Sequence, residues 1–294
     1  MAKTIENFID RSNGEYNLHI KSGESVEIPA IDYYFDNVII EESANLIIAE
    51  NSENWLLINC RQNFTLEGTI IFKKFIADKT LRELMVDGVR YTHQYKIDNL
   101  GGKGGDSGFT DGNHKFSGAS GNSTFGGGGG AGGYWHRRSG ATPGAAGSNE
   151  IGGVTSFSYG GNGAKRKKYC NGGILFLNIG HDFFIGKNNL IDLRGEDGES
   201  GVAGKNGTGS IRGMSSVIAS GGGGGAPGGE GGVLYHKVGG NYSGYVLKTL
   251  VNGGTGGTEG KGGRFPENDF PSCHGLDGGK GENGRSGFVK VVRQ

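Results

Sequence analysis

The sequence predicts a mainly β and irregular fold in two parts. A β-rich, solenoid-like domain is expected over residues 1–98, followed over residues 99–294 by a bundle of polyglycine type II helices with short strands and exposed loops. Two observations carry this prediction. Short β-branched and aliphatic segments recur about every ten residues in the first part. Of the 63 glycines, only Gly14, Gly23, Gly68 and Gly88 precede Asn99.

The first part contains four segments that are typical of short strands. Residues 37–40, 45–49, 55–60 and 64–72 are β-branched or aliphatic and are separated by polar turns. Strands of this length and spacing occur in sandwiches and in parallel solenoids, and we favour the solenoid. A helix is predicted over residues 79–86, where Thr80 is a candidate N-cap and Glu83 completes a capping box.

An internal repeat favours the solenoid. Residues 57–66 (LINCRQNFTL) resemble residues 176–185 (FLNIGHDFFI), and with a small insertion residues 70–72 align with residues 191–193. If the repeat is structural, the two parts of the chain share at least one layer of strands. The alternative is chance similarity between two pairs of apolar strands.

The glycines after Asn99 have a three-residue period, which is the period of the extended left-handed helix. The longest series are Gly195 to Gly207, Gly222 to Gly231, Gly254 to Gly263 and Gly275 to Gly287. With five prolines and interrupted triplets the chain is not collagen. Disordered linkers are the alternative, but the strict period and the apolar segments 173–179, 232–238 and 287–292 that follow glycine tracts favour ordered helices.

The composition excludes several classes of protein. The 30 basic and 30 acidic residues balance, so we expect no nucleic-acid partner. Three cysteines are too few for a disulfide framework and are typical of a reducing compartment. The first ten residues lack the apolar core of a signal peptide, so we expect synthesis in a cytoplasm without secretion.

The sequence motifs predict no enzyme. The dense glycine tracts match dinucleotide-binding patterns by chance, without the strand and helix that such a site needs. Cys273 and His274 have no partner pair at zinc spacing, and the carboxylates are scattered. We therefore expect no catalytic residue, no metal and no cofactor.

Aromatic and basic residues concentrate between the glycine tracts, a composition typical of binding surfaces. The alternative for each ring is that it folds back into a small core. The candidate contact residues are Phe116, Phe125, Tyr134, Trp135, Arg137, Arg138, Tyr169, Tyr235, Tyr242, Tyr245, Phe265 and Phe270.

Residues 99–294, with their alternating glycine motifs and aromatic segments, resemble the distal tail-fibre adhesins of T-even-like bacteriophages. The resemblance implies a packed sandwich of polyglycine type II helices whose loops form a tip. That tip would recognise a bacterial outer-membrane protein or lipopolysaccharide, through the candidate loops 109–125, 134–143, 164–170, 233–252 and 264–274. Residues 1–98 differ from the attachment domain of that family.

The resemblance predicts a receptor-binding protein at a tail-fibre tip of a virion, joined through the N-terminal domain to a fibre or baseplate protein. Three alternatives remain. An ice-binding protein would need a flat, regular face of small residues. A tailspike that degrades surface polysaccharide would need an acidic groove. A structural virion protein would bind no receptor.

Overall fold

The computed structural model describes residues 5–11, 14–49, 55–73, 81–86, 89–94, 108–110, 134–136, 171–204, 206, 221–264 and 274–292. The described part is mainly β-sheet, which confirms the predicted β-rich class. Its one helical element is η1 (Ile5–Phe8), a short 3-10 helix.

Most strands belong to three sheets, which we name A, B and C. Sheet A contains β1 (Ile9–Asp10), β2 (Asn17–Ile20), β5 (Val38–Ile40), β8 (Phe64–Leu66), β15 (Phe183–Ile185) and β18 (Tyr242–Gly244). Sheet B contains β3 (Ser25–Ile28), β6 (Asn45–Ile48), β9 (Thr69–Phe72), β16 (Leu190–Asp192) and β19 (Thr249–Leu250). Sheet C contains β4 (Asp32–Phe35), β7 (Trp55–Cys60), β14 (Ile174–Ile179), β17 (Val233–Val238) and β20 (Phe288–Val291).

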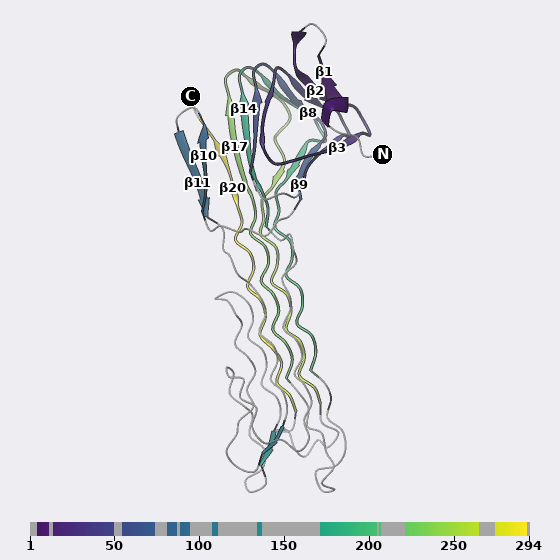
Figure 1. Cartoon of the computed structure of the whole chain (residues 1–294), viewed down its shortest axis with the longest axis vertical. Coiled ribbons are helices and arrows are strands. Elements are labelled where there is room, and N and C mark those ends of the chain that lie inside the picture. Colours follow the sequence, from purple (N-terminus) through teal and green to yellow (C-terminus); the bar gives the residue numbers. More distant parts are fainter. Residues whose placement is uncertain are drawn as a thin grey trace.

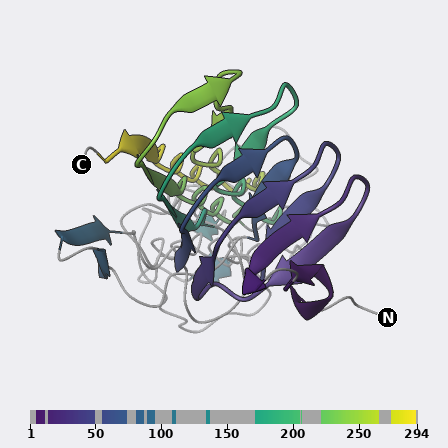
Figure 2. The same cartoon turned by 90° about the horizontal axis from the view of Figure 1, so that it is seen from above.

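The chain visits the three sheets in a fixed order. From β2 onward it passes through sheets A, B and C in turn, and it does so five times. Neighbouring strands of successive turns are parallel, for example β7 with β14 and β14 with β17. We call these five turns the stack; Figure 2 shows them side by side, from purple at the N-terminal end to yellow-green.

The register of the stack confirms the internal repeat. In sheet C, Leu57 pairs with Phe176 and Cys60 pairs with Ile179. In sheet A, Phe64 pairs with Phe183. The small insertion in the alignment is also correct, because Ile70 of sheet B pairs with Ile191. The strands predicted over 37–40, 45–49, 55–60 and 64–72 are β5 to β9.

The core lies inside the stack. Alternate residues of each strand point inward, so equivalent positions of successive turns form columns of apolar side chains. One column in sheet A consists of Leu18, Val38, Phe64, Phe183 and Tyr242. Its first four members are completely buried, and the rings of Phe64 and Phe183 meet edge to face at 5.5 Å. Burial of such columns is the main stabilising contribution in the stack.

A second cluster covers the outer face of sheet C. There Tyr91 of β11 (Val89–Gln94) packs against Phe176 and Tyr235, with ring centroids 5.0 Å apart in both cases. β11 forms an antiparallel hairpin with β10 (Leu81–Val86), in which Val86 pairs with Val89. The helix predicted over residues 79–86 is therefore wrong. Asp87-Gly88 is a strong signal for a tight hairpin turn, and strand pairing prevails over the local capping box.

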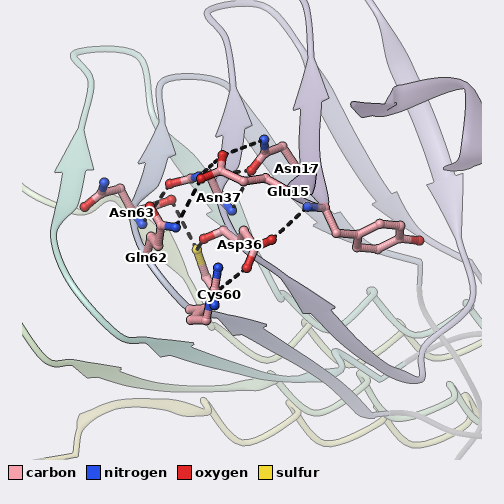
Figure 3. A network of polar contacts seen from close by, with 9 residues as sticks. Glu15, Asn17, Asp36, Asn37, Cys60, Gln62 and Asn63 are labelled. Carbon is pink, nitrogen blue, oxygen red and sulfur yellow. Dashed lines mark hydrogen bonds and ion pairs between the residues drawn. The ribbon is translucent and has the colours of Figure 1, made fainter. Parts of the chain in front are cut away.

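A ladder of polar side chains stabilises the corner between sheets C and A (Figure 3). Each side-chain oxygen accepts the backbone N–H of the equivalent residue in the next turn, so these N–H groups have partners at the corner. Figure 3 labels the first three residues of the ladder, Asn17, Asn37 and Asn63. The bonds run from Asn37 N to Asn17 Oδ1 (3.0 Å), from Asn63 N to Asn37 Oδ1 (3.2 Å), from Asp182 N to Asn63 Oδ1 (3.2 Å) and from Asn241 N to Asp182 Oδ1 (2.8 Å).

Beside this ladder, Cys60 is a structural thiol. Its Sγ donates to the carbonyl oxygen of Asn63 at 3.1 Å (Figure 3), and burial raises the pKa of the thiol to about 12. A thiol that stays protonated is a poor nucleophile. Nearby, Asp36 accepts the N–H of Tyr16 at 2.8 Å and pairs with Arg61 at 2.7 Å.

The two ends of the stack differ. At the N-terminal end, β1 pairs antiparallel with β2, and Phe8 of η1 is buried in the core, with Ile5 and Ile9 packed against it. At the C-terminal end the last strands are β18, β19 and β20, and each has a paired neighbour on one side only among the described residues. We call this the open end.

Glycine-rich segments leave the stack and return to it at a single corner. Segments 194–204 and 221–232 lie between β16 and β17, and segments 252–264 and 274–287 lie between β19 and β20. Both pairs therefore start after a strand of sheet B and end before a strand of sheet C. They run side by side away from the sheets (Figure 1). The interval between β9 and β14, at the same corner, includes β10 to β13.

Backbone hydrogen bonds join these segments at every third residue. Segment 194–204 donates to segment 252–264, from Gly195 to Asn252 (2.9 Å), Gly198 to Thr255 (2.7 Å) and Gly201 to Thr258 (2.9 Å). Segment 221–232 runs antiparallel to segment 194–204, with bonds from Gly223 to Val202 (2.8 Å), Ala226 to Glu199 (2.9 Å) and Gly229 to Glu196 (2.7 Å).

The expected boundary between residues 1–98 and 99–294 crosses the sheets. β7, which precedes it, pairs along its whole length with β14, which follows it. The same holds for β8 with β15 and for β9 with β16. Strands from both parts of the chain therefore build one stack.

The core column of sheet A provides a matched pair of substitutions. Phe183→Ala should lower the free energy of unfolding by about 3–5 kcal/mol, because Phe183 is completely buried. Phe184→Ala should cost about 0.5 kcal/mol or less, because the Phe184 side chain is 40 % exposed. Urea unfolding followed by circular dichroism measures both values, and equal losses would contradict the assignment of the inner face.

The glycine segments provide a second matched pair of substitutions. A Cβ on Gly281 would overlap the carbonyl oxygen of Ala226 in the neighbouring segment, so Gly281→Ala should cost roughly 1–3 kcal/mol. The exposed neighbour Lys280 has no such constraint, and Lys280→Ala should change stability by about 0.5 kcal/mol or less. Thermal unfolding distinguishes the two; a neutral Gly281→Ala would show that the segments are not packed this closely.

Candidate functional site

The end of the glycine segments away from the sheets is the first candidate surface, and we call it the distal end. A short parallel strand pair lies there, formed by β12 (Gly108–Thr110) and β13 (Tyr134–His136) and coloured blue-teal at the bottom of Figure 1. Phe109 and Trp135 are partners in its register. Two of the aromatic segments that the sequence singled out are therefore brought together.

Backbone and side-chain hydrogen bonds fix the bases of the distal connections. The N–H of Gly275 donates to the carbonyl oxygen of Gly263 at 3.0 Å, which closes the connection between segments 252–264 and 274–287. The side chain of Asn206 accepts the N–H of Arg264 at 2.8 Å, so segment 194–204 is joined to the same point. These bonds fix the positions at which the distal connections begin and end.

An ion-pair network lies on the outside of these bases. The Lys261 ammonium lies 2.8 Å from Glu259 and 2.9 Å from Asp277, and Asp277 also accepts the N–H of Gly262 at 2.8 Å. That N–H and the Lys261 ammonium lower the pKa of Asp277. The charged groups of this network are paired with each other. The network therefore holds segments 252–264 and 274–287 together.

Of the twelve predicted contact residues, the structure brings Tyr134 and Trp135 to the distal end, on β13. Seven others lie outside the described residues: Phe116, Phe125, Arg137, Arg138, Tyr169, Phe265 and Phe270. Phe265 and Phe270 belong to the connection whose bases are Arg264 and His274.

The remaining three candidates lie on the stack. The predicted loop 233–252 is not a connection between glycine segments, because it contains β17, β18 and β19. Tyr235 is buried, with 3 % of its surface exposed, and packs in the cluster beneath the hairpin. Tyr242 and Tyr245 are 46 % and 59 % exposed at the open end. Tyr235 therefore has a core role, and the other two belong to a second surface.

At this open end, an inward-facing polar pair takes the place of apolar core residues. The Tyr242 hydroxyl lies 2.6 Å from Nδ1 of His236, which is itself buried. Burial lowers the pKa of His236 and raises that of Tyr242, so the imidazole is neutral and the phenol keeps its proton. The Nδ1 atom of a neutral ring can accept a hydrogen bond from the phenol O–H, so both groups have a partner where the core meets solvent.

The open end also carries a groove that the sequence reasoning missed. A cavity of about 600 Å³ lies between β11 and β20, lined by Val89, Arg90, Tyr91, Thr92, Tyr235, Phe288, Lys290, Val291 and Val292. The available signal was the Asp87-Gly88 turn, which predicts the hairpin that forms one wall. Which strand the hairpin would face could not be inferred from local sequence.

Among the described residues, no group of three or more His, Cys, Asp or Glu side chains is placed to hold a metal ion. The described part of the chain has no helix with the length and apolar character needed to cross a membrane. Comparisons with known protein families, curated proteins and solved structures found no match to this chain.

The His236 pair predicts a pH dependence of stability. Because the folded pKa lies below the ordinary value of about 6.5, the unfolded chain binds a proton more readily. Stability is therefore retained above pH 6.5 and falls as the pH drops through that value towards the folded pKa. Guanidinium unfolding between pH 7.5 and pH 5 should show a steeper loss for the unmodified chain than for His236→Gln.

The matched control is Tyr242→Phe. It removes the hydroxyl but leaves a buried imidazole, so it should lower stability at every pH while keeping the steeper slope. An identical slope in the unmodified chain and in His236→Gln would contradict this account.

Proposed function

We propose that the chain is a receptor-binding tip protein of a bacteriophage tail fibre, which binds an outer-membrane protein or lipopolysaccharide on a bacterial surface. In this proposal the stack is a parallel β-solenoid and the glycine segments are polyglycine type II helices. Connections at the distal end make the contact with the receptor, and binding involves no chemical step.

The hydrogen-bond spacing supports the polyglycine assignment. Donors recur at every third residue, as a helix with three residues per turn requires. At positions such as Gly198, Gly225 and Gly257, a Cβ would overlap a carbonyl oxygen of a neighbouring segment. Glycine at these positions therefore serves close packing of backbones, as in other assemblies of extended helices.

One observation carries the functional proposal: the glycine segments leave successive turns of the stack at the same corner. The described ends of segments that are far apart in sequence therefore lie together, remote from the sheets (Figure 1). A frame of this kind holds several variable connections against one target. A surface built from several rigidly based loops is the usual way in which a binding protein combines a stable scaffold with variable specificity.

The residue types at the distal end fit this role. Trp135 lies on β13, and the connections between glycine tracts contain Arg137, Arg138, Phe265 and Phe270 in their sequence. Aromatic and arginine side chains dominate binding hot spots, because they give a large contact area and directional hydrogen bonds. Arginine also suits the phosphate groups of lipopolysaccharide.

The stack is proposed as the part that joins the virion. Residues 1–72 supply most of its first three turns, which is compatible with attachment of the N-terminal part to a fibre or baseplate protein. The receptor surface and the attachment surface then lie at opposite ends of the glycine segments.

The proposal is tested by binding of the fluorescently labelled full chain to a panel of bacterial cells that includes the host of origin. We expect saturable binding to susceptible cells. Replacement of residues 265–273 by a glycine–serine loop of equal length, or Trp135→Ala, should weaken binding at least about tenfold, because hot-spot residues typically contribute that much.

The matched control is Tyr245→Ala, an exposed aromatic residue on the stack, which should bind cells like the unmodified chain. Thermal unfolding of every variant checks that the fold is retained. Absence of binding to any cell surface, or undiminished binding by both distal variants, would overturn the proposal.

A further inference from the structure

The edge of sheet C at the open end has backbone groups that no described strand pairs. β20 pairs with β17, and the N–H of Val292 donates to the carbonyl oxygen of His236 at 2.8 Å. In a parallel ladder, alternate residues direct their backbone groups to the same neighbour. Residues 288, 290 and 292 therefore face β17, whereas the N–H and C=O groups of Val289 and Val291 point to the open edge.

The side chains around this edge are unusually apolar for a surface. Val289 and Val291 are 40 % and 55 % exposed, and Phe288 of the same strand is 43 % exposed. Unpaired strand edges of this kind are sites for pairing with another chain unless charges, prolines or a covering element block them. β20 contains one charged residue, Lys290, and no proline.

The groove beside the edge has room for an added strand. It holds about 600 Å³, and its walls are β11 on one side and Phe288, Val291 and Val292 on the other. The ring of Phe288 is fixed by an edge-to-face contact with Tyr235 at 5.7 Å. An extended segment could pair with β20 while placing alternate side chains in this groove.

The positive charge of the open end favours a partner strand with acidic side chains. Residues 233–252 and 286–292 contain Lys237, Lys248 and Lys290 and no Asp or Glu. The cations of the groove itself are Arg90 and Lys290, again without a carboxylate. An incoming strand with acidic side chains is therefore favoured, whereas β20 of a second copy would set Lys290 against Lys290.

At the N-terminal end of the stack, a short segment of the chain itself covers an edge strand. There η1 and β1 supply Ile5, Phe8 and Ile9, together with Glu6 and Asp10. This short segment of apolar and acidic residues covers the edge of sheet A in the first turn, where β1 pairs with β2.

From these observations we propose that the open end is a docking site for a β-strand of a different protein. The strand adds to the free edge of β20 and carries apolar side chains alternating with Asp or Glu. This inference goes beyond receptor binding and is independent of it, since the distal end takes no part.

The test uses the full chain extended beyond Gln294 by a flexible glycine–serine linker and a six-residue strand. The linker gives the strand an effective concentration of the order of mM, so that weak pairing is detected. Three versions alternate valine with glutamate, lysine or serine. Residue-resolved amide hydrogen exchange measures protection at Val289 and Val291, with Lys290, which faces β17, as the internal reference.

We expect the glutamate strand to slow exchange at Val289 and Val291 at least about tenfold relative to the lysine strand, with the serine strand in between. Exchange at Lys290 should not change. In the Lys290→Glu variant, the glutamate and lysine strands should protect Val289 and Val291 equally, or the lysine strand should protect them more.

A second variant tests the edge itself. Val289→Pro removes an N–H that points to the open edge and not to β17, so the fold should be retained and the thermal midpoint little changed. Protection at Val291 by the glutamate strand should be lost in this variant.

Equal protection by the glutamate and lysine strands, or protection by none of them, would overturn the proposal. Concentration-dependent dimerisation of the unextended chain that Val289→Pro abolishes would also overturn it, because the occupant would then be a second copy. Binding to cells plays no part in any of these readouts, so failure here is distinct from failure of the proposed receptor function.

Discussion

Direct backbone contact between glycine segments is the constraint on which the rest of the molecule depends. Segment 221–232 is buried along its whole length, and its N–H groups donate both to segment 194–204 and to segment 274–287. Because glycine buries no side chain, each segment is stabilised mainly by hydrogen bonds worth about 0.5–1.5 kcal/mol net, against a high entropic cost of ordering. No segment of this kind is stable alone. The stack supplies the missing stability, because its apolar columns fix both ends of every pair.

At the junction between the stack and the glycine segments, an ion pair sets the alignment of two segments. Glu230 interrupts the buried glycine run, and its carboxylate lies 2.7 Å and 3.1 Å from two nitrogens of Arg285 in the adjacent segment. Its backbone N–H donates to the side chain of Asn171 at 2.9 Å. Only the Glu230 carboxylate is buried, and without Arg285 it would be a buried charge with no charged partner, so the pair specifies the alignment of its two elements more than it adds stability. The alignment of segments 221–232 and 274–287 is set here, next to the sheets.

Much of the stack could be predicted because its signals are local and periodic. Residues 57–66 and 176–185 look alike because they occupy equivalent places in adjacent turns, and the strands at 174–179, 233–238 and 288–291 follow glycine tracts directly. The hairpin over 81–94 could not be recognised in the same way. Thr80 and Glu83 match a capping box, which competes with the turn signal of Asp87-Gly88, and the packing of Tyr91 on sheet C favours the strand.

The candidate surfaces were harder to predict, for a physical reason. Composition predicts both Trp135 and Tyr242 as contact residues, although they lie at opposite ends of the glycine segments. Which end a residue reaches depends on where the chain re-enters the sheets, and that is decided by pairing between strands more than one hundred residues apart, such as β7 and β14. The sequence predicts a surface position for Tyr235, because nothing near it in sequence reveals Tyr91, the ring that covers it.

The shared exit corner has a consequence for how such a molecule can change in length. Each glycine segment that the structure describes is hydrogen-bonded to its neighbours at three-residue intervals, so an insertion of one or two residues in one segment would break the alignment with all of them. A change that keeps the bonds must add or remove whole triplets, in the outgoing and returning segments together. In the polyglycine type II helices proposed above, which rise about 3.1 Å per residue, the reach of the distal end beyond the sheets would change only in steps of about 9 Å.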